Sequence, residues 1–130
     1  MADTVTSQVI TDTSGVKFVV KLTNFSDGSG ETDVIKVDAS TTTFMTQDGA
    51  RKVAKIFYSI NTTSPKSVVE LKWAGATNST IMFLSGQGSL DFRSAGDEIT
   101  NNATTPTGDV LLSTRNFANG DNYSIVIEFR

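Results

Sequence analysis

Apolar and polar residues alternate with a period of two in at least five segments of this chain. Successive side chains of a β-strand point to opposite faces, so each such segment has one face suited to a core and one suited to water. No long segment has the three-and-four spacing of a helix. The pattern predicts an all-β protein. The residues predicted to face inward are Val16, Phe18, Val20, Leu22, Ile35, Val37, Ala54, Ile56, Tyr58, Ile60, Val69, Leu71, Trp73, Tyr123, Ile125, Ile127 and Phe129.

Clusters of Gly, Asn, Ser and Pro separate the predicted strands. The segments 16–23 and 35–37 flank a Gly-rich turn and are predicted to form a hairpin, and the segments 54–60 and 69–73 are predicted to pair in the same way. Further strands are predicted at 5–10, 81–84, 90–92, 110–114 and 123–129. Eight or nine short strands in 130 residues indicate a single antiparallel β-sandwich, jelly-roll-like, that spans residues 1–130 as one domain.

Two segments are predicted to lie outside the strands. Gly86–Gly88 has glycines but is followed by no Gly-Lys-Ser/Thr and no helix, so a hairpin turn is favoured over a phosphate-binding loop. The polar stretch Ser94–Thr107 contains Asn101, Asn102 and Pro106 and is predicted to be a long surface loop. Because binding residues are often carried on loops, this stretch is one candidate for a contact with a partner.

The composition excludes several kinds of chemistry. The chain has no Cys and no His, so it has no disulfide, no Cys/His zinc site, no Cys nucleophile and no Ser-His-Asp triad. The net charge is −3 and the basic residues are scattered, so no nucleic-acid partner is expected. No segment approaches the roughly 20 apolar residues of a membrane span, and no signal peptide is visible at the N-terminus. We expect a soluble protein made in the cytoplasm.

Oxygen-bearing side chains occur at alternate positions in one Gly-rich turn: Asp27, Ser29, Glu31 and Asp33. Such a group of hard oxygen ligands is compatible with calcium, but it lacks the glycine and glutamate spacing of an EF-hand loop. Asp and Ser also cap their own turns by bonding the backbone, and this interpretation of residues 27–33 is favoured. No metal, cofactor or cofactor-binding residue is therefore assigned.

Carboxylates that a glycoside hydrolase could use are present at Asp97, Glu98, Asp109 and Asp121. Asp109 and Asp121 each follow a glycine, which is typical of turns. A sugar-cleaving site also needs aromatic platforms, and the single Trp73 falls on the apolar side of its strand. The sequence therefore predicts that the protein is not an enzyme, and no catalytic residue is assigned.

Several strand and turn motifs resemble a family of small virion structural proteins of tailed bacteriophages, notably those that infect marine cyanobacteria. The similar segments lie towards both ends of the chain, while roughly residues 41–101 match weakly. The matching segments are 1–10, 22–31, 35–40, 107–114 and 120–125.

The resemblance implies a non-enzymatic component of the phage particle, located in the virion, whose partners are a major capsid protein or neck and tail proteins. A capsid decoration or cement protein is the expected role. A neck or tail component and a carbohydrate-binding β-sandwich module are the alternatives. Homo-oligomerisation is also expected. Residues 1–8, with few apolar side chains, are expected to form an extended arm that pairs with the sheet edge of a neighbour.

Overall fold

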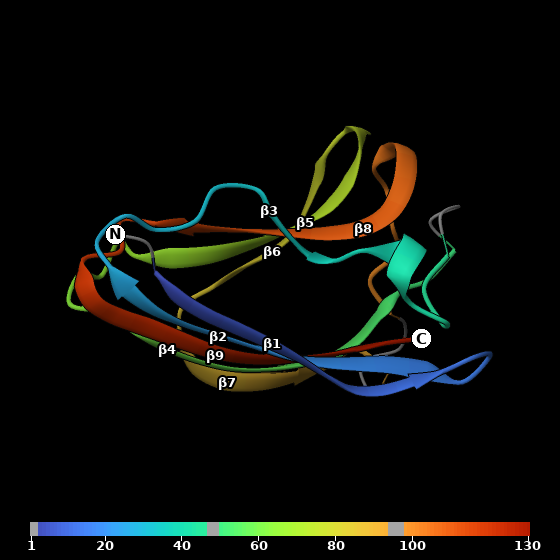
Figure 1. Cartoon of the computed structure of the whole chain (residues 1–130), viewed down its shortest axis with the longest axis horizontal. Coiled ribbons are helices and arrows are strands. Elements are labelled where there is room, and N and C mark those ends of the chain that lie inside the picture. Colours follow the sequence, from blue (N-terminus) through green and yellow to red (C-terminus); the bar gives the residue numbers. More distant parts are fainter. Residues whose placement is uncertain (1–2, 47–49, 94–97) are drawn as a thin grey trace.

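The computed structural model describes residues 3–46, 50–93 and 98–130, which form nine β-strands and one short 3-10 helix. The elements are β1 (Thr4–Thr13), β2 (Lys17–Asp27), β3 (Val34–Val37), η1 (Ala39–Thr41), β4 (Val53–Asn61), β5 (Val68–Thr77), β6 (Ser79–Leu84), β7 (Gly86–Asp91), β8 (Thr104–Arg115) and β9 (Asn119–Phe129). Figure 1 shows the strands stacked in two layers. The expected all-β sandwich is confirmed.

The strand order is that of a jelly roll with one added strand. The lower layer in Figure 1 is a five-stranded sheet in the order β1-β2-β9-β4-β7, and the upper layer is a four-stranded sheet in the order β3-β8-β5-β6. Without β1, each layer has four strands, and the chain passes from one layer to the other at almost every connection. Strand β1 extends the lower sheet beside β2.

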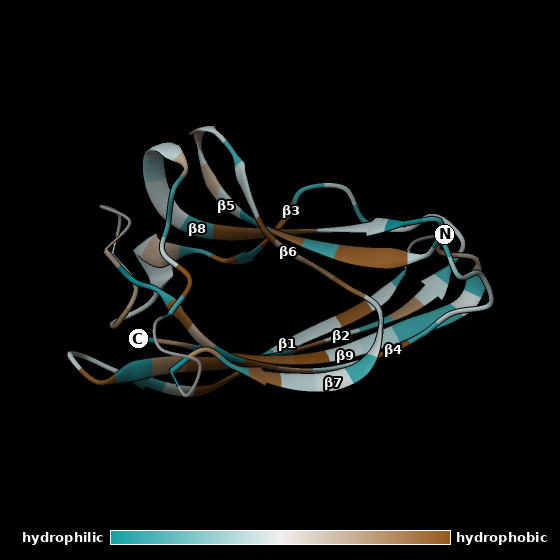
Figure 2. Cartoon of the chain, turned by 180° about the vertical axis from the view of Figure 1, so that it is seen from behind, coloured by the Kyte–Doolittle hydropathy of each residue, from teal (hydrophilic) through white to brown (hydrophobic). Residues whose placement is uncertain are grey.

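The core lies between the layers and is formed by the inward rows of both sheets. Figure 2 shows hydrophobic segments on strands of both layers. Phe129 contacts Phe18 of its own sheet at a centroid distance of 6.1 Å and Trp73 of the opposite sheet at 6.0 Å, and the second contact joins the two sheets. The expected burial of most inward residues is confirmed. Three expectations are corrected: Val16 and Ile35 are exposed, and Tyr58 is only partly buried.

The two predicted hairpins are wrong. Strand β2 pairs with β1 and β9, whereas β3 pairs with β8 in the opposite sheet. Strands β4 and β5 are likewise in different sheets. Alternation fixes which face of a strand is buried but not which strand lies beside it, and loops of about six residues are long enough to cross the roughly 10 Å between sheets.

The segments predicted as turn and loop are partly strand. Gly86–Gly88 is the first half of β7, paired with β4, and the chain crosses between the sheets at Ser85. Within the polar stretch 94–107, residues 94–97 lie outside the described residues, Ile99 forms a bridge with Val53, and Thr104–Thr107 begins β8. Glycine and threonine in these segments are typical of turns, so the sequence pattern did not indicate that the segments belong to strands.

The N-terminal segment is part of the chain's own sheet. Residues 4–8, expected as an arm reaching a neighbour, pair in register with β2, and residues 1–2 lie outside the described residues. Carboxylates fix both ends of β1. Asp3 accepts hydrogen bonds from the 26–30 turn, and Asp12 accepts them from the backbone N–H groups of Thr43 and Phe44 at 2.8 Å each. Strand β1 is thus an anchored edge strand.

Candidate functional site

The side chains considered for calcium point to three different environments. Asp27 Oδ1 accepts hydrogen bonds from the backbone N–H of Ser29 at 3.0 Å and from its hydroxyl at 2.5 Å, as expected for a self-capped turn. Asp33 lies on the outer face of the four-stranded sheet and bonds Lys72. Glu31 is buried. Among the described residues, no group of three or more Asp, Glu, His or Cys side chains could hold a metal ion.

Glu31 is the centre of a polar cluster buried between the sheets. Its Oε1 accepts hydrogen bonds from Asn24 Nδ2 at 2.6 Å and from the Tyr123 hydroxyl at 2.7 Å, and its Oε2 lies 2.5 Å from Lys36 Nζ. Burial, together with the hydrogen bond to Glu31, raises the pKa of Tyr123. The cluster ties the crossing loop to β2, β3 and β9, so Glu31 has a structural role.

Asp3 is hydrogen-bonded to Asn24 of this cluster and to the 26–30 turn that follows it. Its Oδ2 accepts a hydrogen bond from Asn24 at 3.0 Å, and its Oδ1 accepts bonds from the backbone N–H groups of Asp27 and Gly30 at 3.1 and 3.3 Å. Burial opposes its ionisation, but these donors outweigh that effect and lower the pKa of Asp3 to about 2. The negative charge of Asp3 is therefore part of the folded turn.

Two of the carboxylates considered for acid–base catalysis accept hydrogen bonds from backbone N–H groups. Asp109 Oδ1 accepts a hydrogen bond from the Ala39 N–H at 2.8 Å. Asp121 is buried and its two oxygens accept bonds from the N–H groups of Thr63 at 3.2 Å and Ala118 at 2.8 Å. Both residues hold loops, in agreement with their position after glycines. Asp97 lies outside the described residues, and Glu98 follows it on the segment leading to Ile99.

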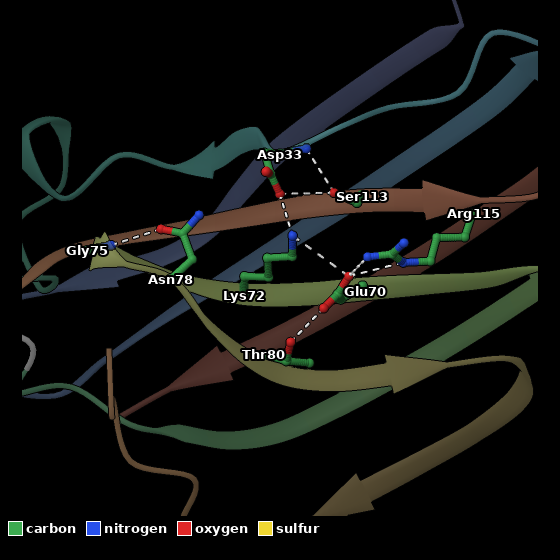
Figure 3. A network of polar contacts seen from close by, with 8 residues as sticks. All are labelled: Asp33, Glu70, Lys72, Gly75, Asn78, Thr80, Ser113 and Arg115. Carbon is green, nitrogen blue, oxygen red and sulfur yellow. Dashed lines mark hydrogen bonds and ion pairs between the residues drawn. The ribbon is translucent and has the colours of Figure 1, made fainter. Parts of the chain in front are cut away.

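The outer face of the four-stranded sheet carries a charge network, shown in Figure 3. Its centre is Glu70 on β5, whose side chain is 4% exposed. Arg115 donates to Glu70 Oε1 through Nε at 3.2 Å and Nη2 at 2.6 Å, and Thr80 donates to Oε2 at 2.5 Å. Lys72 lies between Glu70 and Asp33, 2.7 Å from Asp33 Oδ1. The network joins β5, β6 and β8 to Asp33, the residue that precedes β3.

These contacts stabilise the charged forms of both acids. Burial disfavours the ionised form of Glu70, but the bonds from Thr80 and Arg115 and the charge of Lys72 lower its pKa overall. The hydrogen bond from Lys72 is the main reason that the pKa of Asp33 is also lowered. The charged groups of this network are therefore occupied with one another.

A band of neutral polar residues crosses the outer face of the five-stranded sheet, which also carries ion pairs such as Lys17–Glu128 and Lys55–Asp91. The register of its strands places five hydroxyl or amide side chains in one line across the sheet, which we call the hydroxyl row. Its members are Thr6, Thr23, Ser124, Ser59 and Gln87. The Thr6 and Thr23 hydroxyls are hydrogen-bonded to each other. A surface of this kind both donates and accepts hydrogen bonds without carrying charge.

Two exposed phenylalanines flank the hydroxyl row. Phe25 on β2 is 58% exposed and Phe57 on β4 is 50% exposed. They are two strands and four residues apart in register, a separation of about 17 Å at ordinary strand spacings. Neither ring was predicted as a functional residue, although Phe25 shares the outward row of its strand with Thr23, and Phe57 shares that of its strand with Lys55 and Ser59. An aromatic residue in the otherwise polar, outward-facing row of a strand is the sequence signal that could have identified both.

Loops at one end of the sandwich form two neighbouring shallow, open hollows. One, of about 390 Å³, is lined by residues 60–65 with Ser67, Ser85 and Gly86. The other, of about 290 Å³, is lined by residues 61–63 and 119–122. Asn61 donates to Asn122 at 3.1 Å on this rim, and Asn122 lies directly across from Phe25 in the sheet. An aromatic ring, two amides and a hollow thus lie next to one another.

Trp73 does not contribute to any of these surfaces, because it is buried, as expected, with its ring edge-to-face against Phe129. No helix in the described ranges 3–46, 50–93 and 98–130 has the length and apolar character needed to cross a membrane. Comparison of the chain with protein-family models, with curated proteins and with solved structures finds no match.

Proposed function

We propose that this protein is a structural component of a tailed-phage virion, a capsid decoration or cement protein that acts by contact and not by catalysis. The observation that carries the proposal is the contrast between carboxylates that are bonded within the chain and aromatic rings that are exposed. Glu31, Asp109 and Asp121 are occupied by partners within the chain, whereas Phe25 and Phe57 are half exposed beside the uncharged hydroxyl row. Exposed apolar groups among hydrogen-bonding side chains are the usual composition of a protein contact.

The sequence resemblance to virion structural proteins and the jelly-roll order of the strands both support this proposal. Jelly rolls are used by viral capsid domains and also by lectin domains. The fold supports the proposal by analogy, since one fold hosts many functions. The absence of cysteine also suits a protein that persists outside a cell, because no thiol can be oxidised.

The direct test is the content of purified particles. Quantitative mass spectrometry should find the protein in washed virions, and image reconstruction should place it on the head surface with the symmetry of the shell. Density at the neck or tail would replace decoration with the alternative role. Presence in the infected-cell lysate without recovery in particles would contradict the proposal.

Surface variants identify the face that binds the particle. We expect Phe57→Ser to lower the copy number per virion, because it removes an exposed aromatic ring from beside the hydroxyl row. The matched control is Phe83→Ser, at a ring that is 55% exposed on the four-stranded sheet. A loss with Phe83→Ser alone would move the contact to the other sheet, and unchanged copy number for both variants would contradict binding through either ring.

A second candidate function is glycan binding, which the rim beside Phe25 favours. An exposed ring can stack on the apolar face of a sugar, while the amides of Asn61 and Asn122 bind hydroxyl groups. Asp121 adds no free charge, since both of its oxygens are bonded. On an array of neutral glycans, wild-type binding that Phe25→Ala abolishes and Phe83→Ala retains would support this candidate. Absence of binding to every glycan would remove it.

A further inference from the structure

Strand β1 presents a long free edge that lacks the usual protection. Edge strands of soluble proteins are commonly short, bulged, or interrupted by Lys or Pro, because an open edge pairs with other strands. Residues Thr4 to Thr11 contain no charged residue, no Gly and no Pro, and their pairing with β2 is regular up to the bulge after Val9. Among the described strands, the other sheet edges are β3 with four residues and β6 and β7 with six each.

The inward row of β1 contains two uncovered valines, on either side of Ser7. In the register with β2, Val5 lies across from Asn24 and Val9 across from Val20, both of which are buried. Val5 and Val9 therefore point to the core side of the sheet, yet they are 45% and 54% exposed. The inward row of the five-stranded sheet thus continues from β2 onto β1, where the two valines remain about half exposed.

The edge is also held in place. The hydrogen bonds of Asp3 to the 26–30 turn and of Asp12 to Thr43 and Phe44 fix both ends of the strand. A fixed edge loses less conformational entropy on pairing than a mobile arm would. Strand β1 is therefore suited to pair with a further strand without moving from its own position in the sheet.

We propose that two copies of this chain pair through their β1 edges, antiparallel, about a two-fold axis at Ser7. This alignment places Val5 opposite Val9 of the second copy, Thr6 opposite its Gln8, and Ser7 opposite its Ser7. A two-fold axis needs a self-complementary patch, and this alignment alone gives each valine a valine partner within the regular part of the strand. The five-stranded sheets then join into one continuous sheet.

The electrostatics agree with a second copy as the occupant. The paired segment, Thr4 to Ile10, is uncharged, so no like charges meet across the new ladder. Asp3 faces Thr11 of the second copy, outside the valine pairs. Seven residues from each copy make a small interface, and we expect it to dissociate on dilution. The inference concerns the isolated protein and goes beyond the virion proposal, so either can fail alone.

A disulfide trap tests the pairing in a chain that has no cysteine of its own. Residues directly opposite in an antiparallel ladder have Cα atoms about 4.5 or 5.5 Å apart, within the range for a disulfide. Ser7→Cys should therefore form a covalent dimer under mild oxidation. The matched control is Thr13→Cys, on the same strand but outside the paired segment, and we expect Ser7→Cys to cross-link at least about tenfold faster.

A blocking variant separates this interface from any other. Val9→Lys places a charge in the exposed inward row, which opposes edge pairing but should not disturb the fold, as circular dichroism can verify. In sedimentation experiments the wild type should show a concentration-dependent dimer, and Val9→Lys should remain monomeric. A wild type that is monomeric at all concentrations, a dimer that Val9→Lys leaves intact, or equal cross-linking of the two cysteine variants would overturn the proposal.

Discussion

The outer faces of the two sheets present different kinds of side chain to water. On the four-stranded sheet, Glu70, Lys72 and Arg115 bind one another, and the carboxylate at the centre is almost completely covered. On the five-stranded sheet, the uncharged hydroxyl row crosses the face with Phe25 and Phe57 beside it, and ion pairs such as Lys55–Asp91 are exposed. The charge network stabilises its own sheet and has one exposed ring, Phe83, across from Glu70, whereas the hydroxyl row has two exposed rings beside it. The difference favours the hydroxyl row as the surface for a contact, and Phe83 is the ring that tests the other face.

The largest expected effect comes from the core that supports both faces. Trp73→Ala should lower the free energy of unfolding by about 3–5 kcal/mol, because it removes a fully buried side chain that contacts Phe129 of the other sheet. Urea denaturation followed by circular dichroism measures the loss. Phe83→Ala, at an exposed ring, is the control and should cost less than about 0.5 kcal/mol. Similar losses for the two variants would contradict the assignment of Trp73 to the core.

The charge network should respond more strongly than an ion pair on the opposite face. Glu70→Gln should cost about 2 kcal/mol, less than a fully buried pair, since the side chain of Arg115 is 53% exposed and water can solvate it. The control is Lys55→Gln on the five-stranded sheet, where Nζ lies 3.9 Å from Asp91 at an exposed pair, with an expected cost below about 0.5 kcal/mol. Equal costs, measured by denaturant unfolding, would remove the distinction between the faces.

Acid should weaken the anchoring of β1. The pKa of Asp3 is about 2 in the folded protein against an ordinary 3.8, so its contribution to stability is present above about pH 4 and is lost as the pH falls towards 2. We expect Asp3→Asn to be less stable at neutral pH and to have a shallower decline between pH 4 and 2. Urea midpoints across this range give the comparison. An unchanged slope would show that Asp3 does not anchor the strand.

The smallest expected effect is at one of the exposed rings beside the hydroxyl row. Phe57→Ser should change the free energy of unfolding by no more than about 0.5 kcal/mol, since half of the ring is already in water. Ile56→Ser is the control at the adjacent, buried position, and it should cost several times more. A loss of about 2 kcal/mol for Phe57→Ser would place this ring among the residues that hold the fold, and would weaken its assignment to contact.

Alternation made the fold class and most of the core predictable. Phe18, Val20, Leu71 and Trp73 are buried as expected, because a two-residue period depends only on local geometry. The neighbours of each strand were not predictable in this way. Strand β2 pairs with β9 about a hundred residues later, and no turn signal encodes such a pairing.

The polar residues were harder to place than the apolar ones. Glu31 lies in a Gly-rich turn and resembles a solvent-exposed ligand in sequence, yet it is buried against Tyr123, which is 92 residues away. Similarly, the hydroxyl row exists only because five strands are in register, so no single segment contains it. Features that depend on several distant strands become visible only once the strand order is known.

The position of β9 has a consequence for synthesis of the protein. Strands β2 and β4 have no ladder with each other, and each pairs with β9, which starts 58 residues after the last residue of β4. At about 5–20 residues per second, a ribosome needs roughly 3–12 s to add those residues. During that interval the nascent chain has two amphipathic strands without their common partner. We expect it to depend on chaperones until β9 emerges and to fold afterwards, as is typical of topologies dominated by non-local pairing.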